Sequence, residues 1–246
     1  MRDSAVAFVT VVVTLACGTV SADPRADSTI RLEAQSQLAL QPAVAHERLD
    51  VSVQDGSVHL SGSVGTLFQK WRAIDAVAHV KGVTQIVDEL ELRSGSGSDS
   101  ALADDVLRRF RDMPRLSRGS LSVDVSSGTV RISGRLDDAR LRFDARDAAA
   151  KIPGVVAVVD AISSGDKSDG ELGVQVPAVL GRRSVTFVPG DFDIHVEGGI
   201  VKLEGTVPRV WERILAERAT LGVNGVKGVV NMLEVVPSPR ADTYGQ

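Results

Sequence analysis

The sequence predicts an α+β protein made of three tandem small αββαβ domains. A ten-residue motif carries the prediction: D-G-S-V-H-L-S-G-S-V at 55–64 returns as S-G-T-V-R-I-S-G-R-L at 127–136 and as G-G-I-V-K-L-E-G-T-V at 198–207. The spacing between copies is 72 and then 71 residues, counted from 56 to 128 and from 128 to 199. A repeat this regular indicates one folding unit per copy.

In each copy, two alternating strands flank a tight turn and a third, apolar strand closes the unit. Apolar and polar residues alternate over 49–53 and 58–64, which indicates strands with one buried face and one solvent-exposed face. Between them, Asp55 and Gly56 are residue types that tolerate the positive φ of a two-residue hairpin turn. The segment 86–90 recurs near the end of the other copies and is expected to form the third strand.

Glycines recur at three places in every copy, and they are expected to be structural. The first belongs to the hairpin turn, the second relieves crowding near a strand end, and the third precedes Val and ends a helix. These motif glycines are Gly56, Gly62, Gly82, Gly128, Gly134, Gly154, Gly199, Gly205 and Gly225.

A helix is expected between the second and third strands of each copy. Alanines at 73 and 76 recur at 145 and 148 and again at 216 and 219, and this spacing forms a core-facing stripe. In the second copy, Asp137 is expected to cap this helix over 138–151. In the third copy, Pro208 is expected to take its first position.

A shorter helix is expected before each hairpin and is clearest over 101–113. Leu102 and Val106 lie on the same face of this segment. In the third copy Gly173 and Pro177 interrupt the pattern, so the corresponding helix is expected to be short, irregular or absent.

Serine- and glycine-rich stretches at 94–100 and 163–170 have the composition of flexible linkers and separate the copies. The predicted organisation is a signal peptide at 1–22, repeats at 26–93, 100–163 and 170–236, the last with a degenerate first helix, and a disordered tail at 237–246. The net charge of −4 excludes a uniformly basic nucleic-acid binder.

The N-terminal segment has the layout of a cleavable secretory signal. An apolar run at 5–16 precedes V-S-A at 20–22, so the mature chain is expected to begin at Asp23 and to lie in the periplasm. Cys17, the only cysteine, would be removed, which leaves no disulfide framework. The alternative is an outer-membrane lipoprotein anchored through Cys17, although Thr14 stands where lipoprotein signals usually carry an aliphatic residue.

The sequence points to neither catalysis nor a metal. His46 and Glu47 begin like a zincin motif, but Asp50 stands where the second histidine is required. The four histidines show no ligand spacing, and neither a nucleophile elbow nor a complete phosphate loop is present. We therefore expect a non-enzyme with no cofactor, no metal and no small-molecule substrate.

The densest basic cluster is the first candidate for binding. It contains five arginines within eleven residues: Arg108, Arg109, Arg111, Arg115 and Arg118. These side chains are expected either to meet an anionic surface or to form a solvated face paired with neighbouring aspartates, and the sequence leaves both readings open.

Aromatic residues at two repeat positions are the second candidate. Phe68 and Trp211 share one position with Arg140, which indicates partial exposure and contact with an interface or partner. The other position holds Trp71 and its two apolar counterparts, Phe143 and Ile214, and is expected to lie in the core.

The hairpin motif D-G-x-V-x-L-x-G-x-V, followed by G-V-x-x-V-V/I-D/N before the last strand, closely resembles the BON domain family of bacterial envelope proteins. The resemblance implies a three-stranded sheet covered on one face by two helices, a periplasmic address and a role in envelope integrity or osmotic stress. It also implies binding to anionic phospholipid surfaces through a helix of one copy, here the arginine-bearing helix of the second. The alternative is a protein-interaction scaffold or chaperone-like module for other envelope proteins.

Overall fold

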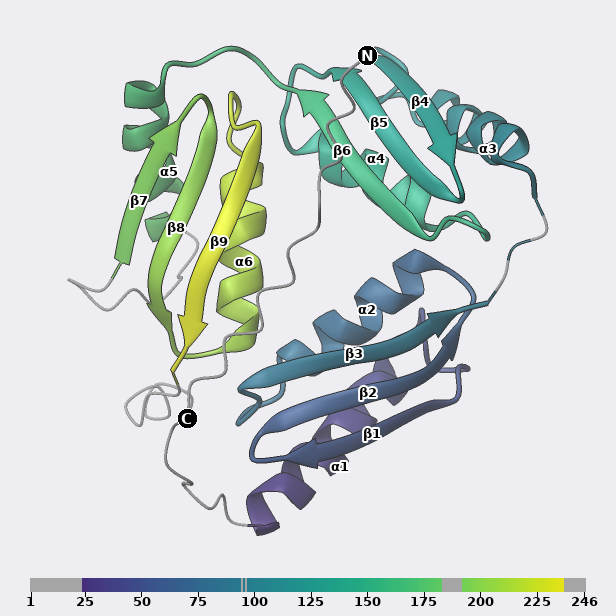
Figure 1. Cartoon of the computed structure of the whole chain (residues 1–246), viewed down its shortest axis with the longest axis vertical. Coiled ribbons are helices and arrows are strands. Elements are labelled where there is room, and N and C mark those ends of the chain that lie inside the picture. The colour runs from purple at the N-terminus through teal and green to yellow at the C-terminus, as the bar shows by residue number, and fades with distance from the viewer. Residues whose placement is uncertain (1–23, 94, 96, 183–191, 237–246) are drawn as a thin grey trace, which may run out of the picture.

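The computed structural model describes residues 24–93, 95, 97–182 and 192–236. The expected signal peptide at 1–22, with Cys17, and the expected tail at 237–246 lie outside the described residues. The described chain forms three units that surround a common centre (Figure 1).

Each unit has the element order helix, strand, strand, helix, strand. The first contains α1 (Pro24–Leu40), β1 (Leu49–Gln54), β2 (Ser57–Val64), α2 (Leu67–Ala78) and β3 (Gln85–Leu92). The second contains α3 (Asp99–Arg111), β4 (Ser120–Ser126), β5 (Thr129–Arg135), α4 (Leu141–Ala150) and β6 (Ala157–Ser163). The third contains α5 (Asp169–Arg182), β7 (Phe192–Glu197), β8 (Ile200–Val207), α6 (Val210–Leu221) and β9 (Gly228–Val235). The predicted α+β fold of three tandem domains is confirmed.

The three sheets share one topology. The middle strand pairs antiparallel with the strand before it and parallel with the strand after the second helix, as where Val58 lies opposite both Val53 and Ile86. Because a parallel pair needs a crossover, the second helix of each unit has to pass over one face of its own sheet. The inward residues of the sheet and both helices then enclose the unit's core.

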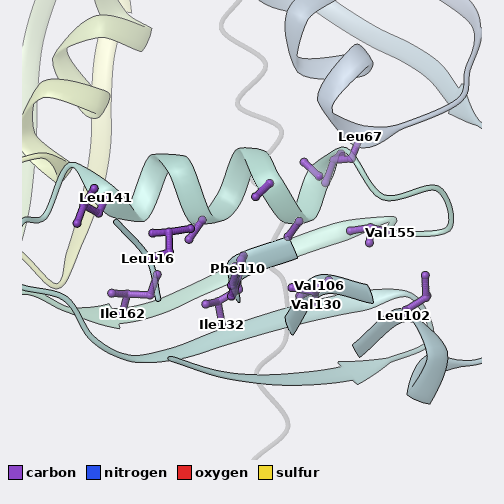
Figure 2. Close-up of a cluster of buried hydrophobic side chains, with 14 of the residues drawn as sticks. Leu67, Leu102, Val106, Phe110, Leu116, Val130, Ile132, Leu141, Val155 and Ile162 are labelled. Carbon is purple, nitrogen blue, oxygen red and sulfur yellow. The ribbon is translucent and has the colours of Figure 1, made fainter. Parts of the chain in front are cut away.

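The core of the second unit shows how these layers meet (Figure 2). Val106 and Phe110 of α3 lie against Val130 and Ile132 of β5, and all four side chains are buried. Leu67, which belongs to α2 of the first unit, is part of the same buried cluster. The units therefore share core surface as well as linkers.

The first helix of the third unit corrects the sequence-based expectation. Gly173 and Pro177 were expected to shorten or remove it, but α5 runs over 14 residues with Pro177 inside. Leu172, Val176 and Leu180 on this helix are completely buried. Burying three such side chains is worth roughly 1.5–3 kcal/mol each, which outweighs a cost of about 3 kcal/mol for an interior proline.

The starts of two second helices also differ from expectation. Asp137 does not cap α4, which begins at Leu141 after Arg140 and has no side-chain cap. The neighbouring Asp138 carboxylate instead accepts a hydrogen bond from the Arg140 N–H, so the chain turns before the helix begins. Pro208 is not the first residue of α6, because the helix begins at Val210.

Candidate functional site

The five arginines all project from the outer surface of the second unit. Helix α3 turns its apolar face to the core and leaves the arginines exposed, three on its last turn and two on the loop beyond. Arg108 pairs with Asp105, and Arg115 lies 3.8 Å from the Asp144 carboxylate. Within the described ranges, three members of the cluster have no ion-pair partner: Arg109, Arg111 and Arg118.

A hollow of about 320 Å³ opens between the loop after α3, the adjoining ends of β4 and β5, and the start of α4. Arg115 and Arg118 line it together with Arg135 at the end of β5. The Arg135 guanidinium lies 3.4 Å from the carboxylate of Asp166 on the following linker. Arg135 was not among the candidates predicted from the sequence. Its signal in the sequence is that it is basic where the other copies have Ser63 and Thr206.

The motif glycines have the backbone conformations that the turn requires. In the first hairpin both central residues have positive φ, 51° at Asp55 and 74° at Gly56, which is the type I′ geometry. A Cβ at Gly62, where φ is 122°, would lie 2.6 Å from the Arg48 carbonyl oxygen, so the second motif glycine allows close strand approach. All nine motif glycines have positive φ.

A repeated aspartate holds each hairpin turn against the first helix of its unit. The Asp99 carboxylate accepts hydrogen bonds from the N–H groups of Ser127 and Gly128 at 2.8 and 3.0 Å. Asp27 and Asp169 make the same pair of bonds in the other units, at 2.9 to 3.0 Å. Sequence reasoning missed these aspartates, although they recur at nearly the repeat spacing.

Phe68 and Trp211 lie at equivalent junctions between units. Beside Leu67, the Phe68 ring faces Lys151 of the second unit, whose Nζ is 4.3 Å from the ring centroid. The Trp211 ring of the third unit stacks on His79 of the first, with centroids 5.8 Å apart and planes 10° apart. The side chains at this position therefore contact neighbouring units of the same chain.

The third junction, from the second unit to the third, is polar. The Asn224 side-chain oxygen accepts a hydrogen bond from the Ala139 N–H at 2.7 Å. The Arg142 side chain, only 1% exposed, donates to the carbonyl oxygens of Leu221 and Val226, both at 3.1 Å. Each unit thus uses the start of its second helix to contact the next, and the three contacts close a ring.

Arg142 also anchors its own unit through the motif aspartate. Its Nε lies 2.7 Å from the Asp160 carboxylate, and its guanidinium donates to the Ile162 carbonyl at 3.0 Å. In the first unit Lys70 makes the equivalent ion pair with Asp88 at 3.0 Å, at a more exposed position. The aspartate of the repeat motif is therefore the partner of a basic residue on the second helix.

The position of Trp71 is not a simple core position, which corrects the expectation. Trp71, Phe143 and Ile214 are half-buried and line a cavity of about 290 Å³ between α2, α4 and α6. Two arginines cover the aromatic members, with Arg146 5.2 Å from the Trp71 ring centroid and Arg218 5.0 Å from that of Phe143. The second helix packs its alanines inward, so larger side chains at this position reach towards the neighbouring units.

One carboxyl group at this cavity has a perturbed pKa. Burial raises the pKa of Asp147 above its ordinary value, while the positive charges of Arg218, Lys151, Arg72 and Arg146 act in the opposite direction. The desolvation of the carboxylate therefore exceeds the combined attraction of four cations.

Neither a metal cluster nor a membrane span is found in the part of the chain that the structure describes. No three His, Cys, Asp or Glu side chains gather there in an arrangement able to hold a metal ion. None of its helices combines the length and apolar character needed to cross a bilayer.

Two solved structures to which the chain shows weak similarity are both of CdsD, a structural protein of the type III secretion system of Chlamydia trachomatis. One is 13% identical with a TM-score of 0.23 and covers 84% of this chain and 96% of that chain. The other is 12% identical with a TM-score of 0.25 and covers 87% and 98%. These scores are too low to support an inference about assembly or role, and no curated protein matches the chain.

The family model of the BON domain matches three successive segments, 26–94, 98–165 and 168–237. Each matched segment contains one hairpin with its positive-φ turn and one motif aspartate or asparagine before the end of the last strand. The chain therefore belongs to the BON domain family and carries three tandem copies of the domain.

Proposed function

We propose that the protein binds anionic phospholipid surfaces peripherally, through α3 of the second domain and the basic hollow beside it. The observation that carries this proposal is the set of three exposed arginines without ion-pair partners in the described chain: Arg109, Arg111 and Arg118. Membership of the BON family supports an envelope-associated, non-catalytic role. Within that role, we propose that the protein contributes to envelope integrity or to osmotic-stress tolerance.

The electrostatics favour weak and reversible contact. A basic residue close to an anionic bilayer contributes about 1 kcal/mol, so three unpaired arginines give a few kcal/mol that salt screening reduces. Arg115, Arg118 and Arg135 converge on a hollow of about 320 Å³, where a lipid phosphate can meet more than one guanidinium. The alternative reading, a solvated face paired with neighbouring aspartates, predicts pairs such as that of Arg108 with Asp105. The unpaired arginines carry charge that no carboxylate in the described chain neutralises, and this charge is what an anionic surface would attract.

The cellular location is part of the same proposal. The signal-like segment 1–22 is proposed to be cleaved before Asp23, which releases the protein into the periplasm. Mass spectrometry of the N-terminus of the mature protein tests this. A diacylated Cys17 would replace the periplasmic assignment with an outer-membrane lipoprotein.

Vesicle sedimentation tests the lipid proposal. The full mature chain is mixed with phosphatidylglycerol-containing vesicles, and with phosphatidylcholine vesicles alone, at low and high salt. A triple variant, Arg109→Glu, Arg111→Glu and Arg118→Glu, is expected to lose sedimentation with the anionic vesicles. Its circular dichroism spectrum and melting temperature should be nearly unchanged, because all three side chains are exposed.

A matched control carries the same charge change elsewhere: Arg31→Glu, Arg131→Glu and Arg213→Glu, which are also exposed. The control is expected to keep most of the binding. Equal loss in both variants would mean that only net charge matters, and no binding by the parent at low salt would refute the proposal.

A second candidate function, a protein-interaction module, is favoured by the outer face of the third sheet. Ile200 is 50% exposed, Val230 48% and Met232 53%, and the β8–β9 pairing places all three on the same side. Exposed apolar side chains gathered on one face are typical of a protein contact. Capture of envelope proteins by the parent, but not by a Val230→Ser, Met232→Ser variant, would support this function.

A further inference from the structure

We propose that the cavity between α2, α4 and α6 binds one single-chain amphiphile with a carboxylate head, the fatty-acid class. The alkyl chain would lie against Trp71, Phe143 and Ile214, and the carboxylate would pair with Arg146. This site is separate from the surface of α3, and its occupation does not depend on vesicle binding.

The walls of the cavity fit an alkyl chain. Side chains from all three domains contribute aromatic and aliphatic surface, with Phe68, Ile74 and Leu221 beside the three residues of the Trp71 position. Its volume of about 290 Å³ lies just below the roughly 300–1,000 Å³ typical of ligand sites. The space suits a single medium-length chain and is too small for a two-chain phospholipid.

Arg146 supplies the specificity for an anionic head. Its guanidinium stacks on the Trp71 ring, and its Nε is buried without a hydrogen-bond acceptor in the part of the chain that the structure describes. Arg146 lines the cavity and forms no ion pair or hydrogen bond with the described residues, and its terminal nitrogens are not among the buried atoms, so they are the donors that a ligand can reach. An ionised acceptor forms the stronger, charge-assisted bond with such a donor. A carboxylate at this place completes the Arg146 side chain, whereas a neutral alcohol forms only the weaker bond between a charged and an uncharged group.

The surrounding charges allow this pairing. Arg72 and Arg218 also lie at the cavity, and Asp75, Asp147 and Glu217 provide negative charge. Arg72 already pairs with Asp75 at 3.4 Å, so that pair contributes little net charge to the ligand. Arg146 and Arg218 then balance the charge of the two remaining carboxylates at the cavity, Asp147 and Glu217, so the lining is close to neutral and contact with Arg146 decides where an anionic head binds.

The two tryptophans of the chain make the site observable. In a Trp211→Phe variant, Trp71 at the cavity wall is the only fluorophore of its kind. Titration with decanoate below its micelle concentration is expected to give a saturable change in Trp71 emission. The complementary Trp71→Phe variant, which keeps Trp211 at the His79 stack, should show little change.

Calorimetry with decanoate then tests the pairing. Arg146→Met, which keeps an unbranched apolar stem but removes the guanidinium, is expected to weaken binding about tenfold or more, from the loss of one charge-assisted bond. Arg131→Met, on the outer face of the same domain, is the matched control and should bind like the parent. Decanol should bind at least tenfold more weakly than decanoate.

A cavity-filling variant, Ile214→Phe, is expected to reduce decanoate binding. If this variant does not fold, the comparison of Arg146→Met with its control, Arg131→Met, tests the site instead. Absence of saturable binding by the parent would refute the site. Undiminished binding by Arg146→Met, equal binding of decanol, or an emission change confined to Trp211 would refute the assignment of the head or of the place.

Discussion

Replacing Arg142 with Met should destabilise the protein more than the equivalent change at Lys70 on the second helix of the first unit. The guanidinium is buried and serves two domains, since it pairs with Asp160 and donates to Ile162 in its own domain and to Leu221 and Val226 in the next. Methionine fills most of the space but cannot donate a hydrogen bond. The substitution therefore leaves one carboxylate and three carbonyl oxygens short of a partner.

The expected cost is about 3–5 kcal/mol, the usual result of removing one partner from a buried ion pair. The equivalent change at Lys70 gives the internal comparison, because Lys70 pairs with Asp88 at 3.0 Å but its side chain is 22% exposed. Water can reach the partner there, so Lys70→Met should cost only about 1 kcal/mol. A double variant, Arg142→Met with Asp160→Asn, should recover part of the loss because the stranded charge is removed.

Urea unfolding followed by circular dichroism measures these differences, and hydrogen exchange of the α6 amides shows whether the contact between the second and third domains is weakened. Exchange at the end of α6, near Leu221, should become faster in the Arg142 variant and stay unchanged in the Lys70 variant. If Arg142→Met costs no more than Lys70→Met, the buried network does not hold the ring together.

Three other outcomes are expected. Asp99→Ala should cost about 2 kcal/mol by urea unfolding, from two charge-assisted bonds to the hairpin at partly exposed sites, and a smaller loss than about 0.5 kcal/mol would contradict the turn-clamp role. Gly56→Val should cost roughly 1–3 kcal/mol, since φ is 74° and the added Cβ would lie 2.9 Å from the Gly82 carbonyl oxygen; a melting temperature like that of the parent would contradict it. Asp147→Asn should stabilise the protein at pH 7 and not at pH 3. The raised folded pKa of Asp147 means that the folded state binds its proton more tightly, so the parent loses stability as the pH rises from below the ordinary value of 3.8 through the folded value. Thermal melts of parent and variant at both pH values check the sign.

The repeated pattern predicted the local structure well where residue preference and packing agree. It predicted the structure less well where a residue such as Pro177 disfavours the element that packing stabilises. Hairpin turns such as Asp55–Gly56 require positive φ, which only a few residue types adopt readily. The sequence therefore predicts where these turns lie. The failure at α5 has the opposite cause: Pro177 disfavours a helix locally, but burial of Leu172, Val176 and Leu180 decides the outcome. Propensity at one residue loses to packing over a whole face.

The repeat could be recognised from the sequence because the same motif returns at a nearly constant spacing. The order of strands and helices within each unit, and the exposed position of the arginines at 108–118, could be predicted because they depend on patterns within about one element. Only the tertiary structure decided which residues meet across units. Phe68 lies against Lys151, Trp211 against His79, and Arg142 against the carbonyl of Leu221. These contacts join residues about one or more repeats apart, and no periodicity within a unit specifies the angle at which three similar domains close on one another. The central cavity exists only because they do, since each domain alone contributes just one of its walls.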